Sequence, residues 1–351
     1  MYFSNFQCYK YSFNLKSPLY MRQIIELKSR EVLICKFLST SLDMIIWSEI
    51  CPLPLFSWDS LKLSYIKLMS IKSYFLRVNW TWFNLLSDKA ILDKICDIDK
   101  YQSLRMCLDT SIYQLLSYIP RFLSRVPISA LIYDYKFANL HYNYYESLKI
   151  KLSYISIKDS VNLVRKYHEK YSNISIRLDM NRNWNLEKFL IFISCFSSYF
   201  FEFIEEPLHQ NLDLFLLSAS NISFNLSIDE SLHLILLNNK LLLSENIKTL
   251  TLKPSIIGSL NLLLDFINLG FVYKKQIVIS SIFESDVGIT NLMIIIYYTD
   301  LINVMGLDTY QWIHNDCLLL DNYLYEYRGS LYLCFLEIIK LIKFQTKLIQ
   351  I

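Results

Sequence analysis

The segment FFEFIEEPL at residues 200–208 decides the fold, because an apolar run typical of a buried core ends in two carboxylates and a proline. Most of this run is typical of a buried strand. Pro207 has no backbone N–H with which to continue a strand ladder, so it helps to end the strand. The strand therefore opens at Glu205, and the surroundings of that carboxylate become the central question.

Short apolar runs like this one recur along the middle of the chain, and helical patterns lie between them. The runs are ISALI (128–132), SLKIK (147–151), ISIRLD (174–179), FFEFIE (200–205), NLSID (225–229), TLTLK (249–253), QIVISS (276–281) and INVMG (302–306). From Lys151 to Ser280, successive polar ends are 24 to 28 residues apart. A strand of about 5 residues, two short loops and a helix of about 11 residues add up to this period. Strands alternating with helices favour parallel units, so eight runs predict an α/β fold with a (β/α)₈-type barrel.

The polar ends of these runs predict a site. In such barrels the groups that act on a substrate lie at the carboxyl ends of the strands. The ends carry, in chain order, Lys151, Asp179, Glu205, Asp229 and Lys253. Three carboxylates on adjacent strands repel one another unless a cation lies between them, and oxygen ligands favour Mg²⁺, with Mn²⁺ also possible. One acid alone would be an ordinary turn residue, so the joint pattern carries the prediction.

The two lysines lie on the strands that flank the three acids, and we expect them to face each other across the metal. A lysine acts as a base only when it can lose its proton, which burial and positive neighbours favour. Lys149 lies two residues before Lys151 on the same strand, so both side chains point the same way. This favours proton abstraction beside a substrate carboxylate, with Mg²⁺ balancing the negative charge that forms.

These strand ends resemble the enolase superfamily, in its muconate-cycloisomerase-like branch. The residues that carry the resemblance are KIK (149–151), RLDMNRNW (177–184), FIEEPL (203–208), SIDESL (227–232) and LKPSIIGSL (252–260). Within this branch the chain most resembles the o-succinylbenzoate synthase family. That resemblance rests on WSEICPLPLFSWDSL (47–61), VISSIFESDVGIT (278–290) and GLDTYQW (306–312). It extends over roughly residues 12 to 316.

The resemblance implies a role for each site residue. Lys151 would abstract the substrate proton and then protonate the leaving hydroxyl, while Lys253 would stabilise the developing charge from the other side. The implied Mg²⁺ ligands are Asp179, Glu205 and Asp229. The implied pocket lining is Lys149, Arg177, Asn181, Ser280 and Ser281. Glu206 and Glu230 each follow an implied ligand and would orient it from behind.

The reaction implied is the dehydration of 2-succinyl-6-hydroxy-2,4-cyclohexadiene-1-carboxylate to 2-succinylbenzoate, a lyase step of menaquinone and phylloquinone biosynthesis. An N-acylamino-acid racemase or dipeptide epimerase would use the same two lysines. Dipeptide epimerases typically carry D-x-D at the last strand end, where this chain reads GLDTY (306–310) with one acid. A catalytically idle barrel kept for binding is the non-enzyme alternative. It would predict a broken site, yet all five positions are intact.

Two departures and two glycines bear on the pocket. Met180 takes a position that is often alanine, and Phe283 is bulkier than expected inside SSIFES (280–285). Both could reshape the pocket. Gly258 and Gly288 follow the sixth and seventh strands, where a backbone could approach an anionic substrate closely or simply turn.

The ends of the chain predict the domain organisation. Residues 1–105 do not fit the period and predict an α+β domain. Its expected strands lie at 9–15 and 31–38, and its expected helices lie at 60–75 and 90–98. The resemblance makes it a capping domain over the mouth of a barrel at 106–325, with the loop at 52–56 near the substrate. The apolar tail at 326–351 predicts a helix packed back on the capping domain.

Composition limits the other classes of function. The net charge is +3, from 35 basic and 32 acidic residues, so a nucleic-acid partner is not indicated. The apolar run at 189–201 is too short for a membrane span, so no stable membrane insertion is expected. The expected partner is a small-molecule carboxylate, and monomer and homo-oligomer both stay open.

The compartment is inferred from cysteine spacing and codon-like bias. The eight cysteines form no C-x-x-C pair, which favours buried thiols in a reducing compartment. Residues with AT-rich codons dominate, and the first residues show no secretory or transit pattern. We therefore expect the plastid stroma of a chloroplast, with the bacterial cytoplasm as the alternative.

Overall fold

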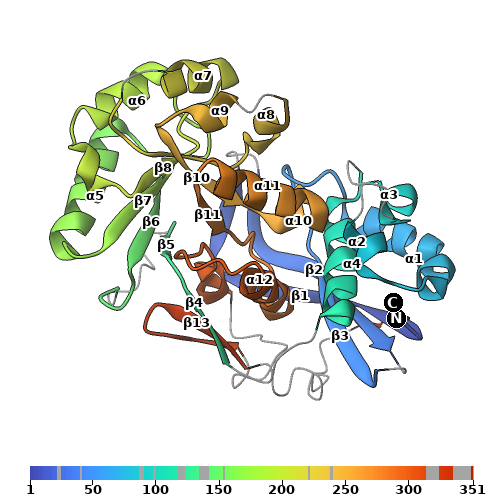
Figure 1. The fold of residues 1–351 in the computed structure, drawn as a ribbon. Helices are drawn as coiled ribbons and strands as arrows, with labels where there is room; N and C mark the ends of the chain where they lie inside the picture. Colours follow the sequence, from blue (N-terminus) through green and yellow to red (C-terminus); the bar gives the residue numbers. More distant parts are fainter. Residues whose placement is uncertain are drawn as a thin grey trace.

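The structure is a computed structural model that describes residues 1–21, 25–39, 42–86, 91–97, 100–117, 123–133, 142–152, 155–219, 222–237, 240–313, 324–334 and 349–350. An N-terminal sheet with its helices lies beside a barrel of parallel strands surrounded by helices (Figure 1).

The N-terminal sheet has the strand order β14-β1-β2-β3, with antiparallel neighbours. Its strands are β1 (Asn5–Met21), β2 (Ile25–Ser39), β3 (Met44–Ile50) and β14 (Ile349–Gln350). Tyr11, Phe13 and Leu15 are buried while the residues between them are exposed, so this part of β1 has one covered face. In β2, residues 32–35 are all buried, because both faces of the sheet are covered there. The strands predicted at 9–15 and 31–38 lie inside β1 and β2, and β3 was not predicted.

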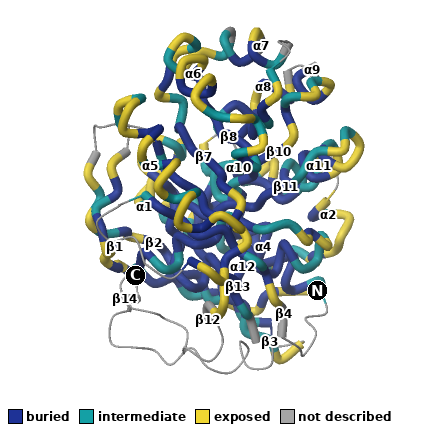
Figure 2. The backbone as a smooth tube through the Cα atoms, turned by 90° about the vertical axis from the view of Figure 1, so that its left-hand side faces the viewer, coloured by how far each residue is buried: buried dark blue, intermediate teal, exposed yellow. Residues whose placement is uncertain are grey.

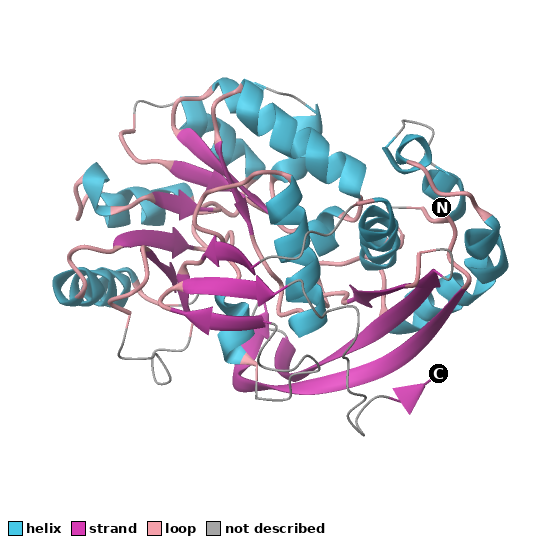
Figure 3. Ribbon diagram, turned by 60° about the horizontal axis from the view of Figure 1, so that its bottom comes forward, coloured by secondary structure: helices cyan, strands magenta, loops and turns pink. Residues whose placement is uncertain are grey.

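Helices pack on the face of this sheet that carries Cys8, Leu33 and Phe37, and the opposite face packs against the barrel. Figure 3 shows the two long curved strands β1 and β2 of this sheet side by side. The helices are α1 (Leu61–Arg77), α2 (Trp82–Leu86), α3 (Ile91–Ile95) and α4 (Gln102–Leu116). The side chain of Ser60 accepts a hydrogen bond from the Leu63 amide at 3.4 Å and so caps the start of α1. Helix α4 is buried along nearly its whole length, because it packs between β3 and helices of the barrel. The predicted boundary at residue 105 falls inside α4.

The barrel strands form a parallel sheet in the order β11-β10-β9-β8-β7-β6-β5. They are β5 (Ala130–Ile132), β6 (Ser147–Lys151), β7 (Ser175–Asp179), β8 (Phe203–Glu205), β9 (Leu226–Ile228), β10 (Ile247–Leu252) and β11 (Gln276–Ile279). Each lies within or beside one of the predicted runs, and the predicted barrel class is confirmed.

The eighth run closes the barrel with very few residues. The Met305 amide donates to the Pro127 carbonyl at 2.8 Å, and the Gly306 amide donates to the Ile279 carbonyl at 2.9 Å. Residues 305–306 therefore bridge the gap between β11 and the start of β5, although they form isolated bridges instead of a strand. A Cβ on Gly306 would lie 2.9 Å from the Ser280 hydroxyl, which explains why this crossing uses glycine.

The helices of the barrel domain follow its strands. They are α5 (Ile157–Lys170), α6 (Leu186–Ile193), η1 (Ser198–Phe200), α7 (Asn211–Ala219), α8 (Leu232–Leu237), α9 (Lys240–Leu243), α10 (Pro254–Ile257), α11 (Leu260–Val272), α12 (Asp286–Tyr298) and η2 (Asp308–Trp312). Figure 2 shows exposed segments on the outer helices and a buried centre around α4 and α12. No helix in the described part of the chain is long and apolar enough to cross a membrane.

The tail differs from its prediction. Residues 324–334 form a hairpin of β12 (Leu324–Tyr327) and β13 (Ser330–Cys334), and β13 pairs with β4 (Leu123–Pro127), which lies beside it in Figure 1. The prediction of a helix over 326–351 is therefore wrong at 326–327, 330–334 and 349–350, where the chain forms strands. Residues 335–348 and 351 lie outside the part of the chain that the structure describes. Gly329 turns the hairpin with a φ of 71°, and a Cβ there would lie 2.6 Å from the Tyr144 carbonyl. Alternation in SLYLC suits the free edge of β4 better than a helix.

Candidate active site

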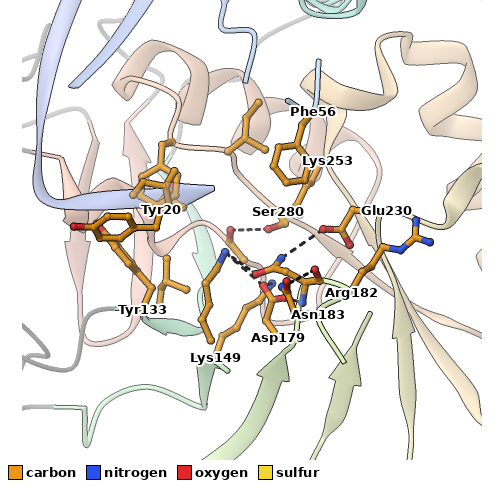
Figure 4. A pocket seen from close by; sticks show the side chains of 18 of the residues that line it. Tyr20, Phe56, Tyr133, Lys149, Asp179, Arg182, Asn183, Glu230, Lys253 and Ser280 are labelled. Atoms are coloured by element: carbon orange, nitrogen blue, oxygen red, sulfur yellow. Dashed lines mark hydrogen bonds and ion pairs between the residues drawn. The ribbon is translucent and has the colours of Figure 1, made fainter. Parts of the chain in front are cut away.

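A cavity of about 1080 Å³ lies at the carboxyl ends of the barrel strands. The N-terminal domain contributes Leu19, Tyr20, Leu53 and Phe56 to its wall, as expected for the loop at 52–56. Figure 4 shows Tyr20 and Tyr133 on one side of the cavity and Glu230 with Arg182 on the other. The cavity is therefore shared by both domains.

Strand register brings the predicted strand-end residues together. Lys151 on β6 is paired with Asp179 on β7, which is paired with Glu205 on β8. Because side chains alternate along a strand, residues at the same register position point into the barrel together. Asp229 and Lys253 follow β9 and β10 directly, so all five polar ends lie at one edge of the sheet.

Lys149 is the centre of the charge cluster. Its ammonium lies 2.7 and 2.8 Å from the two Glu205 oxygens and 3.2 Å from Asp179 Oδ2. Burial opposes the charge on Lys149, but Asp179 and Glu205 together raise its pKa above the ordinary value. Burial also opposes the charge on Asp179, yet Lys149, Lys151 and Lys253 hold its pKa below the ordinary value. Lys149 therefore lines the cavity, as predicted, and also forms ion pairs with Asp179 and Glu205, two of the predicted metal ligands.

The two flanking lysines differ in their exposure. Lys253 forms an ion pair with Asp229, and this carboxylate raises the pKa of Lys253 despite burial. The Lys151 side chain is 26 % exposed, against 14 % for Lys253, and its ammonium lies 3.7 Å from Asp179 Oδ2. Both lysines line the cavity, so each can reach a bound molecule.

The loop after β7 positions Asn181. Asn181 and Arg182 adopt left-handed backbone angles, with φ of 43° and 58°, which asparagine tolerates better than most residues. The Asn181 amide donates to Asp179 Oδ1 at 3.1 Å, and its side chain lies 3.4 Å from the Lys151 ammonium. Asn181 therefore lies in the cavity wall, at the predicted position.

The two glutamates of the EEP turn have different surroundings. Glu205 points into the barrel, whereas Glu206 has a left-handed φ of 39° and turns towards the next loop. Glu206 accepts hydrogen bonds from the amides of Asp229 at 2.9 Å and Ser231 at 2.7 Å. Burial and the neighbouring Glu230 raise the pKa of Glu206 to about 7. These contacts fix the loop that carries Asp229. Glu230 was predicted to orient a metal ligand from behind, but it also lines the cavity itself.

The prediction that Arg177 lines the substrate pocket is wrong. Arg177 is 1 % exposed, and its guanidinium donates to both oxygens of Glu202 at 2.7 and 2.8 Å. It also donates to the Val304 carbonyl at 2.9 Å. Although Arg177 shares a strand face with Asp179, it lies one layer deeper, and its long side chain extends towards the amino ends of the strands. Its contacts close the bottom of the barrel.

The seventh strand end and the closing bridge complete the cavity wall. Ser280 and Ser281 line the cavity, and both hydroxyls donate to the Gly306 carbonyl. Asp308 also lines it, and its Oδ2 accepts from the Leu131 amide at 2.7 Å. Asp308 was noted in the sequence as the single acid of GLDTY, but its contact with the first barrel strand was not predicted.

Several other wall residues were not predicted from the sequence. Among them are Leu19, Tyr20, Tyr133 and Lys188, and Arg182, although Arg182 lies inside the quoted stretch 177–184. Tyr133 follows β5 and donates to the Ser17 carbonyl of the N-terminal domain at 2.6 Å. Such contacts depend on how the two domains pack, and no local pattern encodes them. His209 also lines the cavity, and its position shortly after the EEP turn was the available signal.

Of the two glycines noted in the sequence, neither contacts the cavity. Gly258 ends α10 with a φ of 82°, so it serves as an ordinary left-handed turn. Gly288 lies inside α12, where a Cβ would lie 2.5 Å from Glu284 Cβ and 3.1 Å from the Glu49 carboxyl carbon. Gly288 makes room for two buried glutamates.

The three predicted metal ligands fit Mg²⁺ in donor type and charge. Asp179, Glu205 and Asp229 offer only carboxylate oxygens, are at most 5 % exposed, and gather ammonium groups between them. As these side chains lie, no three acidic, histidine or cysteine residues of the described ranges are placed to hold a metal ion. The ammonium of Lys149 contacts carboxylate oxygens of Asp179 and Glu205, and that of Lys253 contacts Asp229. The metal site therefore stays a prediction.

Comparison with known proteins gives the family. Residues 136–318, more than half of the chain, match the family described as "Enolase C-terminal domain-like". The chain belongs to the enolase superfamily. It is 28 % identical over 300 residues to the o-succinylbenzoate synthase of Haemophilus influenzae, a match that covers 82 % of this chain and 84 % of that one.

Solved structures of the superfamily share the fold of the whole chain. The L-Ala-D/L-Glu epimerase of Bacillus subtilis superposes with a TM-score of 0.76 at 16 % identity, covering 95 % of this chain and 96 % of that one. The o-succinylbenzoate synthase of Thermosynechococcus elongatus, solved with Mg in its active site, gives a TM-score of 0.68 at 16 % identity over 90 % and 95 % of the two chains. Both show the barrel with its N-terminal domain as the shared fold.

The buried carboxyl group of Glu284 predicts that the free energy of unfolding depends on pH. Glu284 accepts from the Ser255 hydroxyl at 3.0 Å and from the Ile282 amide, and burial together with Glu49 raises its pKa to about 7, from an ordinary 4.5. Between these two values the folded protein holds a proton that the unfolded chain has lost. The free energy of unfolding therefore falls as pH rises through this window, by up to roughly 1.4 kcal/mol per pH unit from this group.

Glu284→Gln should remove this loss, because the neutral amide can accept from the Ile282 amide through its oxygen and donate to the Ser255 hydroxyl oxygen through its nitrogen. We expect the variant to be more stable than the parent in urea unfolding at pH 8, and about equally stable at pH 5. A stability difference that is the same at both pH values would contradict the assignment.

Proposed function

We propose that this protein is an o-succinylbenzoate synthase. The reaction would be the dehydration of 2-succinyl-6-hydroxy-2,4-cyclohexadiene-1-carboxylate to 2-succinylbenzoate. The single observation that carries the proposal is the arrangement of Lys151 and Lys253 in one cavity, on either side of the strand ends with Asp179, Glu205 and Asp229. This arrangement suits the removal of a proton beside a carboxylate.

The chain's own residues account for the proton chemistry. Lys151, the more exposed lysine, would remove the ring proton beside the carboxylate and then give it to the leaving hydroxyl, which departs as water. Lys253, held by Asp229, would stabilise the negative charge from the opposite side. Asn181 lies beside Lys151 and would orient its ammonium.

We further propose that Asp179, Glu205 and Asp229 hold Mg²⁺, with Mn²⁺ as the alternative. When bound, the metal would polarise the substrate carboxylate and balance the charge that develops there. Related structures were solved with Mg, which supports this choice. Glu206 would keep the Asp229 loop in place through its two amide contacts.

The named relatives favour this lyase over the racemases. The curated relatives are bacterial o-succinylbenzoate synthases. A racemase or dipeptide epimerase is the second candidate, because solved epimerases share the fold and the same two lysines could transfer a proton between faces. Against the epimerase, position 310 after Asp308 is a tyrosine, so the D-x-D pattern is absent. Menaquinone or phylloquinone biosynthesis would be the setting, and the plastid compartment stays a prediction.

A substrate panel separates these candidates. We expect the purified protein with Mg²⁺ to convert the cyclohexadiene carboxylate, followed by ultraviolet absorbance, much faster than it exchanges the α-proton of N-succinyl amino acids or L-Ala-L-Glu in D₂O, followed by NMR. Faster α-proton exchange in either amino-acid substrate would favour the second candidate.

A further inference from the structure

A segment of the cavity wall has a backbone conformation that its own sequence does not favour. Phe283 lines the cavity and has a left-handed φ of 64°. For a bulky residue this region is strained, and such strain persists only when the surroundings hold it. The contacts that hold Phe283 therefore help to shape the pocket.

Two buried side chains of the N-terminal domain hold this segment from both ends. Arg30 on β2 is 3 % exposed and donates to the Pro52 carbonyl at 3.0 Å and to the Phe283 carbonyl at 3.5 Å. Glu49 on β3 accepts from the Ser285 amide at 3.1 Å and from the Ser285 hydroxyl. Arg30 thus links the two loops that bring Leu53 and Phe283 to the cavity.

Glu49 also binds the start of α12. Its Oε2 accepts from the Gly288 amide at 3.2 Å, so a carboxylate from one domain caps a helix of the other. The first amides of a helix are unpaired and carry partial positive charge, which favours an anion there. Gly288 admits the carboxylate, because a Cβ at this position would lie 3.1 Å from the Glu49 carboxyl carbon. Helix α12 is buried along most of its length, so its start gives the segment a rigid anchor.

The ring of Phe283 then forms part of an aromatic wall. It packs edge-on against Tyr133, with ring centroids 5.8 Å apart. The ring of Tyr133 in turn packs against Trp312, with ring centroids 4.2 Å apart. Phe283 and Tyr133 line the same cavity as the charged strand ends, and Trp312 supports Tyr133 from behind. A six-membered ring that bears a carboxylate could place the carboxylate at the charged strand ends and its ring against Phe283 and Tyr133.

We propose that Arg30 and Glu49 are positioning residues that hold Phe283 in place, and that Phe283 forms the wall against which the six-membered ring of the substrate packs. The two residues act from the N-terminal domain, and neither lines the cavity. The docking of that domain is thereby coupled to the shape of the pocket. This inference rests on the proposed function for its kinetic test, and on the structure alone for its exchange test.

The kinetic test uses the full chain with Mg²⁺ and the cyclohexadiene carboxylate. We expect Glu49→Ala to raise KM about tenfold with kcat changed less than about threefold, because a misplaced wall weakens binding more than chemistry. Glu49→Gln, which keeps a carbonyl oxygen for one amide, should show a smaller rise. In a Phe283→Ala background, Glu49→Ala should add nothing further to KM, since both act through one ring. Independent, multiplying effects of Glu49→Ala and Phe283→Ala would overturn the proposal.

Gln114→Ala is the matched control. Gln114 on α4 donates to Asn291 of the same helix α12 at 3.1 Å, further from the cavity segment. This variant should lower the melting temperature by a similar amount and leave KM unchanged. An equal KM rise in Gln114→Ala would mean that general loosening of the domains explains the effect, and the proposal would fail.

Hydrogen exchange measured by mass spectrometry gives a readout that needs no substrate. Peptides covering residues 280–290 should exchange faster in Glu49→Ala and Glu49→Gln than in the parent, and at the parent rate in Gln114→Ala. Unchanged exchange in both Glu49 variants would overturn the proposal even if the parent is active. If the parent turns over no cyclohexadiene carboxylate, the proposed function fails, and the exchange result still decides whether Glu49 holds the segment.

Discussion

Lys151→Ala should lower the rate of 2-succinylbenzoate formation by a factor of about 10²–10⁴, the usual contribution of a general base. The side chain is exposed enough to meet a substrate and lies 3.7 Å from Asp179, so its removal leaves the buried Lys149 contacts intact. We therefore expect a folded variant with a loss in kcat. Initial rates at saturating Mg²⁺ would measure it. Lys158→Ala, at an exposed position on α5, is the matched control and should be as active as the parent.

Arginine variants separate the base from the electrostatic partner. Arginine keeps a positive charge but does not lose its proton in proteins. Lys151→Arg should therefore be as inactive as Lys151→Ala, whereas Lys253→Arg should retain more activity than Lys253→Ala, because Asp229 still meets a cation. If Lys151→Arg stays active and Lys253→Arg does not, the two roles are reversed.

Glu205→Gln should abolish activity and lower stability together. Glu205 is 1 % exposed and accepts two contacts from Lys149 and one from Thr251 at 3.2 Å. Removing the charge of one partner in a buried pair typically costs about 3–5 kcal/mol when the other charge is left without compensation. Here Asp179 still contacts Lys149, so we expect about 3 kcal/mol or less in urea unfolding without metal.

The same variant tests the metal proposal. The parent should gain thermal stability when Mg²⁺ is added, and Glu205→Gln should lose most of that gain. Glu169→Gln, at an exposed site on α5, should behave as the parent in both measurements. A Glu205→Gln variant that keeps both its activity and its response to Mg²⁺ would show that Glu205 is no ligand.

The barrel was predictable from the sequence because its period is local. Each of the runs from 128–132 to 276–281 contains or adjoins a strand of the sheet, and the strand-end residues converge because parallel register places them at one edge. The eighth run is weaker than predicted, since two residues suffice to bridge β11 and the start of β5.

The errors share a physical cause, which is contact between segments far apart in the chain. Arg177 lies on the predicted strand face, yet its length lets it bind Glu202 at the other end of the barrel. Part of the tail forms strands because the edge of β4 is available for pairing, and a partner strand this far away in the sequence was not considered in the prediction. The wall residues Tyr20 and Tyr133, like the hold of Arg30 and Glu49 on Phe283, depend on the docking of the two domains.

The central claim is that this barrel dehydrates the cyclohexadiene carboxylate at its strand-end lysines with Mg²⁺. The most direct test follows 2-succinylbenzoate formation by the parent protein with Mg²⁺, after EDTA, and after Mg²⁺ is restored. The account predicts turnover that disappears with EDTA and returns with the metal. A folded protein whose melting temperature responds to Mg²⁺ but that forms no 2-succinylbenzoate at any Mg²⁺ concentration would contradict it.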